Sequence, residues 1–185
     1  SPGEQARGLM MPVQVYPLFE QAHRGVLGRD LEEHLAAMCG LWAGQPFAFS
    51  GSHYTVQPSE FPTIGNTAQH PRVPIWCVGA LGRGKSMSRA LRWDGIIPQV
   101  IDPASDIGVR QPSLDEIVEL RALVDADPDV SADFDIVVEG QWTEHSPSAY
   151  KEAGATWWIE SMWDAMAEHS PVTAAYDRLM QGPPA

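Results

Sequence analysis

Hydrophobic positions recur with two different periods in the first third of the chain. From Leu27 to Trp42 the apolar residues fall on one face of a helix, and Gly44 follows as a stop signal. Residues 46–56 instead contain two short β-prone pieces around Ser50 and Gly51, the pattern of a hairpin. These patterns predict an amphipathic helix followed by a β-hairpin.

Beyond residue 72 the pattern alternates between short apolar runs and capped helical segments. The apolar runs are residues 73–78, 94–98, 134–138 and 155–159. Helices are predicted from about Lys85, after a capping box of Ser113 and Glu116, and after the Ser-Pro pairs at 146–147 and 170–171. Continuous apolar runs are typical of strands that are buried on both faces of a parallel sheet. The alternation therefore predicts an α/β fold with about four strand-helix units, the C-terminal part of a (β/α)8 TIM barrel.

Composition narrows the possible partners. The chain has 24 Asp and Glu against 12 Lys and Arg, a formal net charge of −12, which would repel a nucleic-acid backbone. It lacks the run of about 18 apolar residues that a membrane span needs, so we expect no membrane partner and a cytoplasmic protein. Cys39 and Cys77 each lie in an apolar stretch and are expected to be buried free thiols. The six histidines show no metal-binding spacing, and no metal site is predicted.

A glycine-rich stretch after the first of these runs matches a nucleotide-binding pattern. Gly79, four further residues, Gly84, Lys85 and Ser86 fit the phosphate-binding loop of nucleotide hydrolases. Such a loop needs a substantial following helix, but residues 93–95 end this one within about two turns. It also needs an acidic group at a neighbouring strand end, where the sequence has Glu139 and not Asp. Three interpretations remain: a nucleotide site, a solvated loop, or a loop that binds the phosphate of another cofactor.

Several segments, in the same order along the chain, resemble the luciferase-like flavin-dependent oxidoreductases. They are LWAGQPFAFSGSHYTV (41–56), PIWCVG (74–79), RALRWDG (89–95), GATWWIE (154–160) and QGPP (181–184). The resemblance covers about residues 26–184. It implies a (β/α)8 barrel that binds FMN or the deazaflavin F420 at the C-terminal ends of its strands and acts on a small-molecule substrate, as a monooxygenase. The cofactor phosphate would lie near the ends of the strands at 73–78 and 94–97.

The candidate cofactor-binding residues follow from this resemblance and from the glycine-rich loop. They are Gly79, Ala80, Leu81, Gly82, Arg83, Lys85 and Gly95. Glycines let backbone N–H groups approach an anion closely, and the two basic side chains add positive charge in an acidic protein. Trp76, Trp157 and Trp158 are expected to pack in the barrel core or against helices and not to stack on a flavin. No catalytic residue can be named from the sequence.

The front strands of the family have no counterpart in this sequence. Residues 1–25 remain unassigned, although residues 11–16 are β-prone, and residues 26–185 are interpreted as a partial luciferase-like domain. Half a barrel leaves open sheet edges, so we expect a homo-oligomer or a need for the missing half. The alternatives are a P-loop nucleotide-binding protein using residues 79–86 and a non-catalytic barrel half that serves as an interaction module.

Overall fold

The computed structural model describes residues 26–43, 46–59, 72–141, 146–161 and 171–182. The chain divides into two compact units, residues 1–73 and 74–185, each described by itself. The β-prone segment at 11–16 lies outside the described residues. No helix in these ranges is both long and apolar enough to cross a membrane.

The described part of the first unit is a helix and a hairpin. Helix α2 (Val26–Trp42) is followed by β1 (Phe47–Ser50) and β2 (Thr55–Ser59), which pair antiparallel. On α2, Leu35 and Ala37 are buried, as expected for the apolar face of an amphipathic helix. The predicted helix and hairpin are therefore both confirmed.

The carboxylate of Glu33 on α2 binds the turn of this hairpin. It accepts hydrogen bonds from the backbone N–H groups of Ser52, His53 and Tyr54 at 2.8, 2.9 and 3.3 Å. The hydrogen bond from the His53 amide, together with the other two, holds the pKa of Glu33 below its ordinary value. His53 Nε2 also lies 3.0 Å from Asp30 Oδ1, so two acidic side chains of α2 contact the turn.

The second unit is built on a parallel sheet. Strands β3 (Trp76–Ala80), β4 (Gly95–Ile101), β6 (Asp135–Gly140) and β7 (Trp157–Glu160) lie in the order β3-β4-β6-β7, and each neighbouring pair is parallel. A short strand that the sequence did not predict, β5 (Val109–Arg110), pairs antiparallel with the end of β4. The α/β prediction with parallel strands is confirmed, with β4 extending three residues further than predicted.

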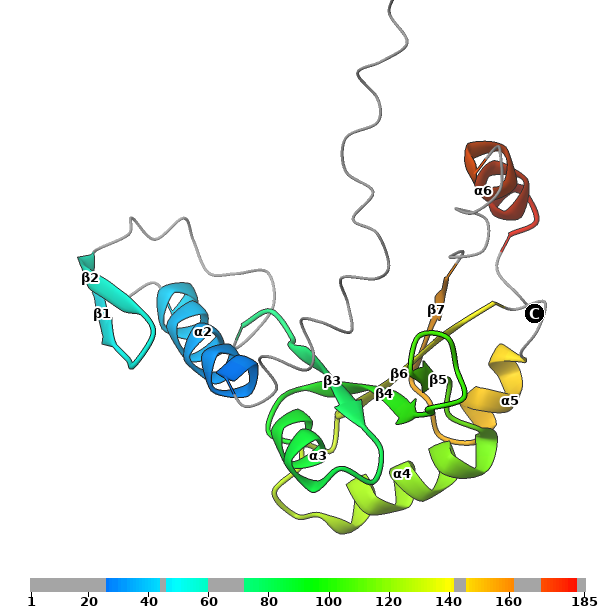
Figure 1. The fold of residues 1–185 in the computed structure, drawn as a ribbon, viewed down its shortest axis with the longest axis horizontal. Coiled ribbons are helices and arrows are strands. Elements are labelled where there is room, and N and C mark those ends of the chain that lie inside the picture. Colours follow the sequence, from blue (N-terminus) through cyan, green and yellow to red (C-terminus); the bar gives the residue numbers. More distant parts are fainter. Residues whose placement is uncertain (1–25, 44–45, 60–71, 142–145, 162–170, 183–185) are drawn as a thin grey trace, which may run out of the picture. The chain divides into compact units, whose positions relative to one another are not determined.

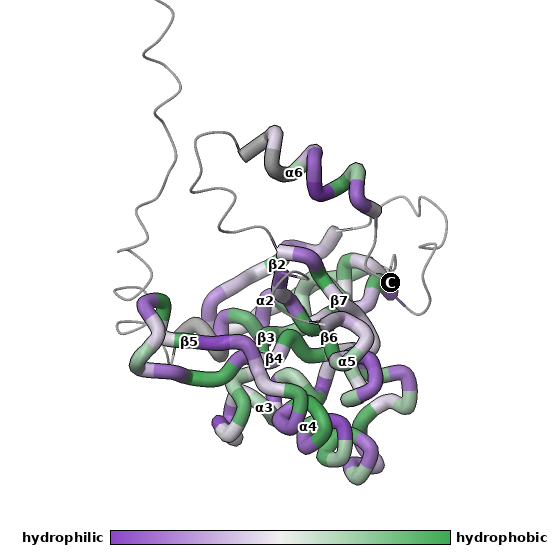
Figure 2. Tube along the Cα trace, turned by 90° about the vertical axis from the view of Figure 1, so that its right-hand side faces the viewer, coloured by the Kyte–Doolittle hydropathy of each residue, from purple (hydrophilic) through white to green (hydrophobic). Residues whose placement is uncertain are grey.

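Helices follow the strands in turn. They are α3 (Gly84–Ala90), α4 (Leu114–Ala126), α5 (Pro147–Glu152) and α6 (Pro171–Met180). Helices α3, α4 and α5 lie along one side of the sheet in Figure 1. Strands β3, β4 and β6 of this sheet are mostly hydrophobic in Figure 2. The core lies between this side of the sheet and the helices, where Ile96, Ile117, Phe134, Ile136 and Val138 are at most 1% exposed. Cys77 is buried here as a free thiol, and burial raises its pKa, while Cys39 of the first unit is only partly buried.

The predicted helix caps are present. Ser113 Oγ accepts from the Glu116 amide, and the Glu116 carboxylate accepts from the Ser113 amide at 2.7 Å, which completes the capping box of α4. Ser146 caps α5 by accepting from the Ala149 amide, with Pro147 as the first helical residue. The cap predicted at Ser170 lies outside the described residues.

Glu116 also forms a two-point ion pair that the sequence did not predict. The two terminal guanidinium nitrogens of Arg110 donate to its carboxylate, at 2.8 and 2.9 Å, and this contact lowers the pKa of Glu116 from 4.5 to about 2. A depressed carboxyl pKa stabilises the fold above pH 4.5, and the stabilisation is lost as the pH falls towards 2.

Replacing Glu116 by Gln should therefore lower the free energy of unfolding, because it removes the charge of the carboxylate. The amide keeps an acceptor for the capping box but loses the charge, so we expect the free energy of unfolding at pH 7 to fall by about 1 kcal/mol, a value reduced for solvent screening. Urea unfolding at a series of pH values should show that the difference in free energy of unfolding between the wild type and Glu116→Gln becomes smaller below pH 4.5. Glu119→Gln, an exposed change on the same helix, is the control; an equal loss in both variants would contradict the role of the ion pair.

Candidate functional site

The N-terminal edge of the sheet is held together by its own side chains. Asp94 Oδ2 accepts from the Ile75 amide at 2.6 Å, and Thr156 Oγ1 accepts from the Ile136 amide at 3.0 Å. Thr156 also donates to Asp135 Oδ1 at 2.8 Å. These bonds fix where the strands begin. Ligand sites of parallel α/β folds lie at the opposite, C-terminal edge, so that edge is where a site is sought.

At the C-terminal edge, a tight turn joins β3 to α3. The Ala80 carbonyl accepts from the Arg83 amide at 3.1 Å, and Gly82 at the corner has φ 73°, a conformation that favours glycine. The start of the turn is fixed from two sides: the Ala80 amide donates to Ser86 Oγ at 2.9 Å and the Leu81 amide to the Gln99 carbonyl at 2.8 Å. The turn is thus rigidly attached to β3, β4 and α3.

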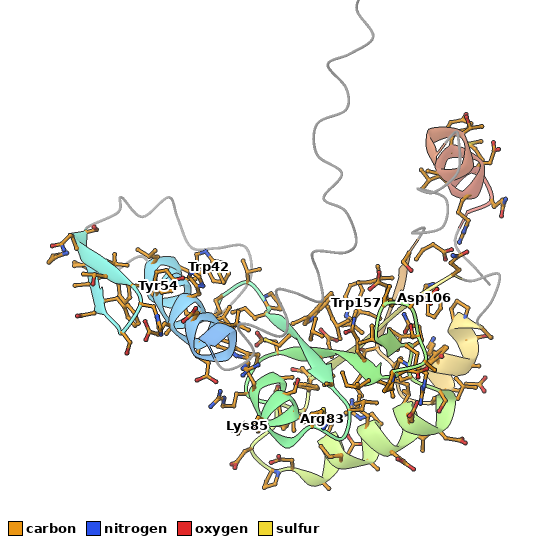
Figure 3. The ribbon with its side chains drawn as sticks, viewed as in Figure 1. Trp42, Tyr54, Arg83, Lys85, Asp106 and Trp157 are labelled. Atoms are coloured by element: carbon orange, nitrogen blue, oxygen red, sulfur yellow. The ribbon has the colours of Figure 1, made fainter. Side chains whose placement is uncertain are left out.

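Three backbone amides of this turn remain available. Among the described residues, no protein acceptor faces the N–H groups of Gly82, Gly84 and Lys85. A methyl group added at Gly82 or Gly84 would meet nothing within 4 Å, so the space above these amides is open. Arg83 and Lys85 are exposed beside them (Figure 3). The residues 82–85, called here the phosphate turn, thus present three N–H groups without a protein acceptor among the described residues and two exposed cationic side chains.

The same geometry does not match what a magnesium-nucleotide site requires. Ser86, the residue that would bind the metal in a nucleotide-binding loop, uses its hydroxyl to accept from the Ala80 amide. The helix that follows has only seven residues. Glu139, at the end of β6, is already engaged in an interaction with the protein. The turn therefore favours a phosphate held by amides and side-chain charge alone.

Gly79, Ala80 and Leu81 have structural tasks in the same region. Gly79 is buried, and a Cβ there would collide with the Ile96 side chain and lie 3.5 Å from the Ala90 Cβ of α3. Its lack of a side chain allows α3 to pack on the sheet. The amides of Ala80 and Leu81 are occupied, as described above. These three residues connect β3 to the phosphate turn. None of their amides is directed at the open space of the turn.

Gly95 lies apart from the phosphate turn. It pairs with Trp76 at the start of β3, four residues before Ala80, which is roughly 13 Å along the strand. The structure therefore does not bring Gly95 together with the other candidate residues. It lies instead against the Trp76 ring and Asp135, and the Trp76 ring centroid is 5.4 Å from that of Trp157 of β7.

Asp135 organises these two tryptophans, and the sequence reasoning missed it. Trp76 Nε1 donates to Asp135 Oδ2 at 3.1 Å, and Trp157 Nε1 donates to Asp135 Oδ1 at 3.0 Å. Packing against a helix is observed for Trp158, whereas Trp157 is 53% exposed. Trp76 and Trp157 lie across the face away from the helices, whereas Trp158 packs on Tyr150 of α5 at 5.8 Å.

No group of three or more His, Cys, Asp or Glu side chains in the described ranges is arranged to hold a metal ion. No protein-family model, curated protein or solved structure matches the chain. The resemblance to luciferase-like oxidoreductases therefore rests on the sequence segments and their order.

Proposed function

We propose that the chain is the C-terminal half of a luciferase-like, flavin-dependent oxidoreductase, a monooxygenase that holds FMN or F420 by its phosphate at the phosphate turn. The observation that carries the proposal is the set of three available amides with two exposed cations, at the C-terminal edge of a sequentially ordered parallel sheet. The four strand-helix units would form about half of a (β/α)8 barrel, whose sites lie at this edge.

Each residue of the phosphate turn has a distinct part in this proposal. The amides of Gly82, Gly84 and Lys85 donate to phosphate oxygens, and the side chains of Arg83 and Lys85 offset the phosphate charge. Gly82 is needed because its φ of 73°, a conformation that favours glycine, makes the corner of the turn. When bound, the cofactor ring supplies the redox and oxygen chemistry, while the protein positions it and excludes water.

Cofactor binding tests the proposal directly. The chain would be titrated with FMN, with F420 and with Mg-ATP, following flavin fluorescence and heat. We expect micromolar or tighter binding of one of the two flavins, weakened about tenfold by Lys85→Ala through loss of a charged hydrogen bond. Lys151→Ala is the matched control, because Lys85 and Lys151 are the only lysines in the sequence and Lys151 lies on α5.

Other outcomes would point to the alternatives. Tight Mg-ATP binding that Lys85→Ala abolishes would overturn the flavin proposal in favour of a nucleotide-binding protein. Binding of none of the three ligands would contradict it as well and favour a non-catalytic interaction module.

A further inference from the structure

Among the described residues of the second unit, no helix lies on one face of the sheet. Helices α3, α4 and α5 cover the other face, and the strand residues that point away from them include exposed apolar side chains. Val78 is 54% exposed, Trp157 53% and Ile159 38%. Val78 pairs with Ile97 and Trp157 with Val137 in the strand register, so all four strands place apolar side chains on this face. The exposed ones lie on the edge strands β3 and β7, whereas Val137 on β6 is fully buried. A face of this kind is an interaction surface or a core that lacks its other half.

Helix α6 also has exposed apolar side chains. In a sequence of parallel strand-helix units, each helix packs over its own strand and the next one. Helix α6 is tied to β7 by the ion pair of Arg178 with Glu160, at 3.3 Å, but no described strand follows β7. Its apolar residues are accordingly exposed, with Tyr176 at 61%, Leu179 at 76% and Met180 at 68%. A strand beyond β7 would give these exposed side chains a surface to pack on.

Both edge strands of the sheet can accept a partner. Within the described residues, β3 pairs only with β4, and β7 pairs only with β6. The two edges differ in sequence but run parallel, so the free edge of β7 can pair with the free edge of a β3 from another molecule. A twofold rotation then pairs the remaining β3 and β7 as well, which leaves no open edge.

We infer that the partner is a second copy of this chain and that two copies close an eight-stranded parallel barrel. Four strands from each copy supply the number of a (β/α)8 barrel, and the open faces become its interior. In this arrangement α6 of one copy covers β7 and the β3 of its partner, next to the partner's α3. The inference goes beyond the proposed function and does not rest on cofactor binding.

The charge distribution along the chain fits this contact. Residues 83–92, which include α3, contain four basic residues and no acidic one. Residues 152–178, which lead through β7 into α6, contain five acidic residues and one basic residue, Arg178, which is paired with Glu160. The twofold arrangement places the basic segment of one copy beside the acidic segment of the other at both junctions. In a protein of net charge −12, this pairing favours self-association over a random approach.

Light scattering coupled to size-exclusion chromatography measures the mass directly. For the full chain at about 50 μM without cofactor, we expect a dimer of twice 20.3 kDa, whose dissociation constant rises with salt. Val78→Asp places a charge on the open face and should shift the protein to monomer. Val118→Asp is the matched control, because Val118 is 52% exposed on α4, close to the 54% of Val78, and this variant should remain dimeric.

A second variant keeps the test decisive if Val78→Asp does not fold, which circular dichroism would show. Leu179 is 76% exposed, so Leu179→Lys should fold normally and weaken the dimer at least tenfold. A monomeric wild type at this concentration would overturn the inference, as would a trimer or an open polymer. A dimer that neither Val78→Asp nor Leu179→Lys weakens would also overturn it, because that dimer would use another surface. Flavin binding by a monomer would contradict the inferred dimer but would remain consistent with the proposed function.

Discussion

Gly95→Ala is expected to lower the free energy of unfolding of the second unit by about 3 kcal/mol, the upper part of the range for overpacking. A Cβ at this position would lie 2.7 Å from the Trp76 ring, 2.8 Å from the Asp135 Cβ and 2.8 Å from the Asp135 carbonyl oxygen. The Trp76 ring could move away only if its hydrogen bond to Asp135 broke. The Asp135 carbonyl oxygen could move away only if β6 shifted. Urea unfolding followed by tryptophan fluorescence measures the loss.

Gly84→Ala is the control for this prediction. A Cβ at Gly84 meets nothing within 4 Å, and Gly84 is the first residue of α3, where Ala is the better helix former. We expect this variant to be as stable as the wild type or slightly more stable. If both variants unfolded at the same urea concentration, the close approach of β4, β6 and Trp76 at Gly95 would be wrong.

Phe134→Ala is the second large effect, with an expected loss of about 4 kcal/mol. Phe134 precedes β6 and is 1% exposed, the largest fully buried side chain among the residues that the structure describes. Removing its ring leaves a cavity in the core between sheet and helices, and close-packed neighbours can fill such a cavity only in part. Thermal and urea unfolding both report the change.

Leu123→Ala provides a comparison within the same unit. Leu123 lies on α4 and is 47% exposed, so its truncation should cost less than about 1 kcal/mol. Equal losses for Phe134→Ala and Leu123→Ala would show that the core does not lie where the structure places it.

Local signals in the sequence were enough to predict most elements. Two helix starts are predicted by residues that interact within one turn: Ser113 with Glu116, and Ser146 with Pro147. Both caps are present in the structure. Apolar runs give strands buried on both sides, as at Ile136 to Val138. Such signals depend on neighbours in the sequence, and the order of parallel strands then follows from their alternation with helices.

Interactions between distant residues could not be predicted in the same way. Asp135 accepts from Trp76, 59 residues earlier, and from Trp157, 22 residues later, and nothing near Asp135 in the sequence signals either bond. Strand β5 has only two residues and is defined by its pairing with β4. The two-point contact of Arg110 with Glu116 depends on that strand and was missed for the same reason.

The glycines of the candidate site show where a motif is informative. The pattern from Gly79 to Ser86 treats its residues as one loop, but the structure separates them by task. Gly79 allows α3 to pack, Gly82 makes the turn, and Ser86 fixes the Ala80 amide. Only residues 82–85 present donors to open space. Sequence spacing identified the right segment, and only the hydrogen bonds show which of its amides are available.

The most direct test of a phosphate-binding turn compares FMN with riboflavin, which differ by the phosphate alone. If the phosphate turn holds that group, FMN should bind at least tenfold more tightly than riboflavin, and Lys85→Ala should reduce this difference while Lys151→Ala leaves it unchanged. The same comparison at higher salt should weaken FMN binding and leave riboflavin binding unaffected. Equal affinity for the two flavins, or a preference for FMN that Lys85→Ala does not alter, would contradict a cofactor phosphate at residues 82–85.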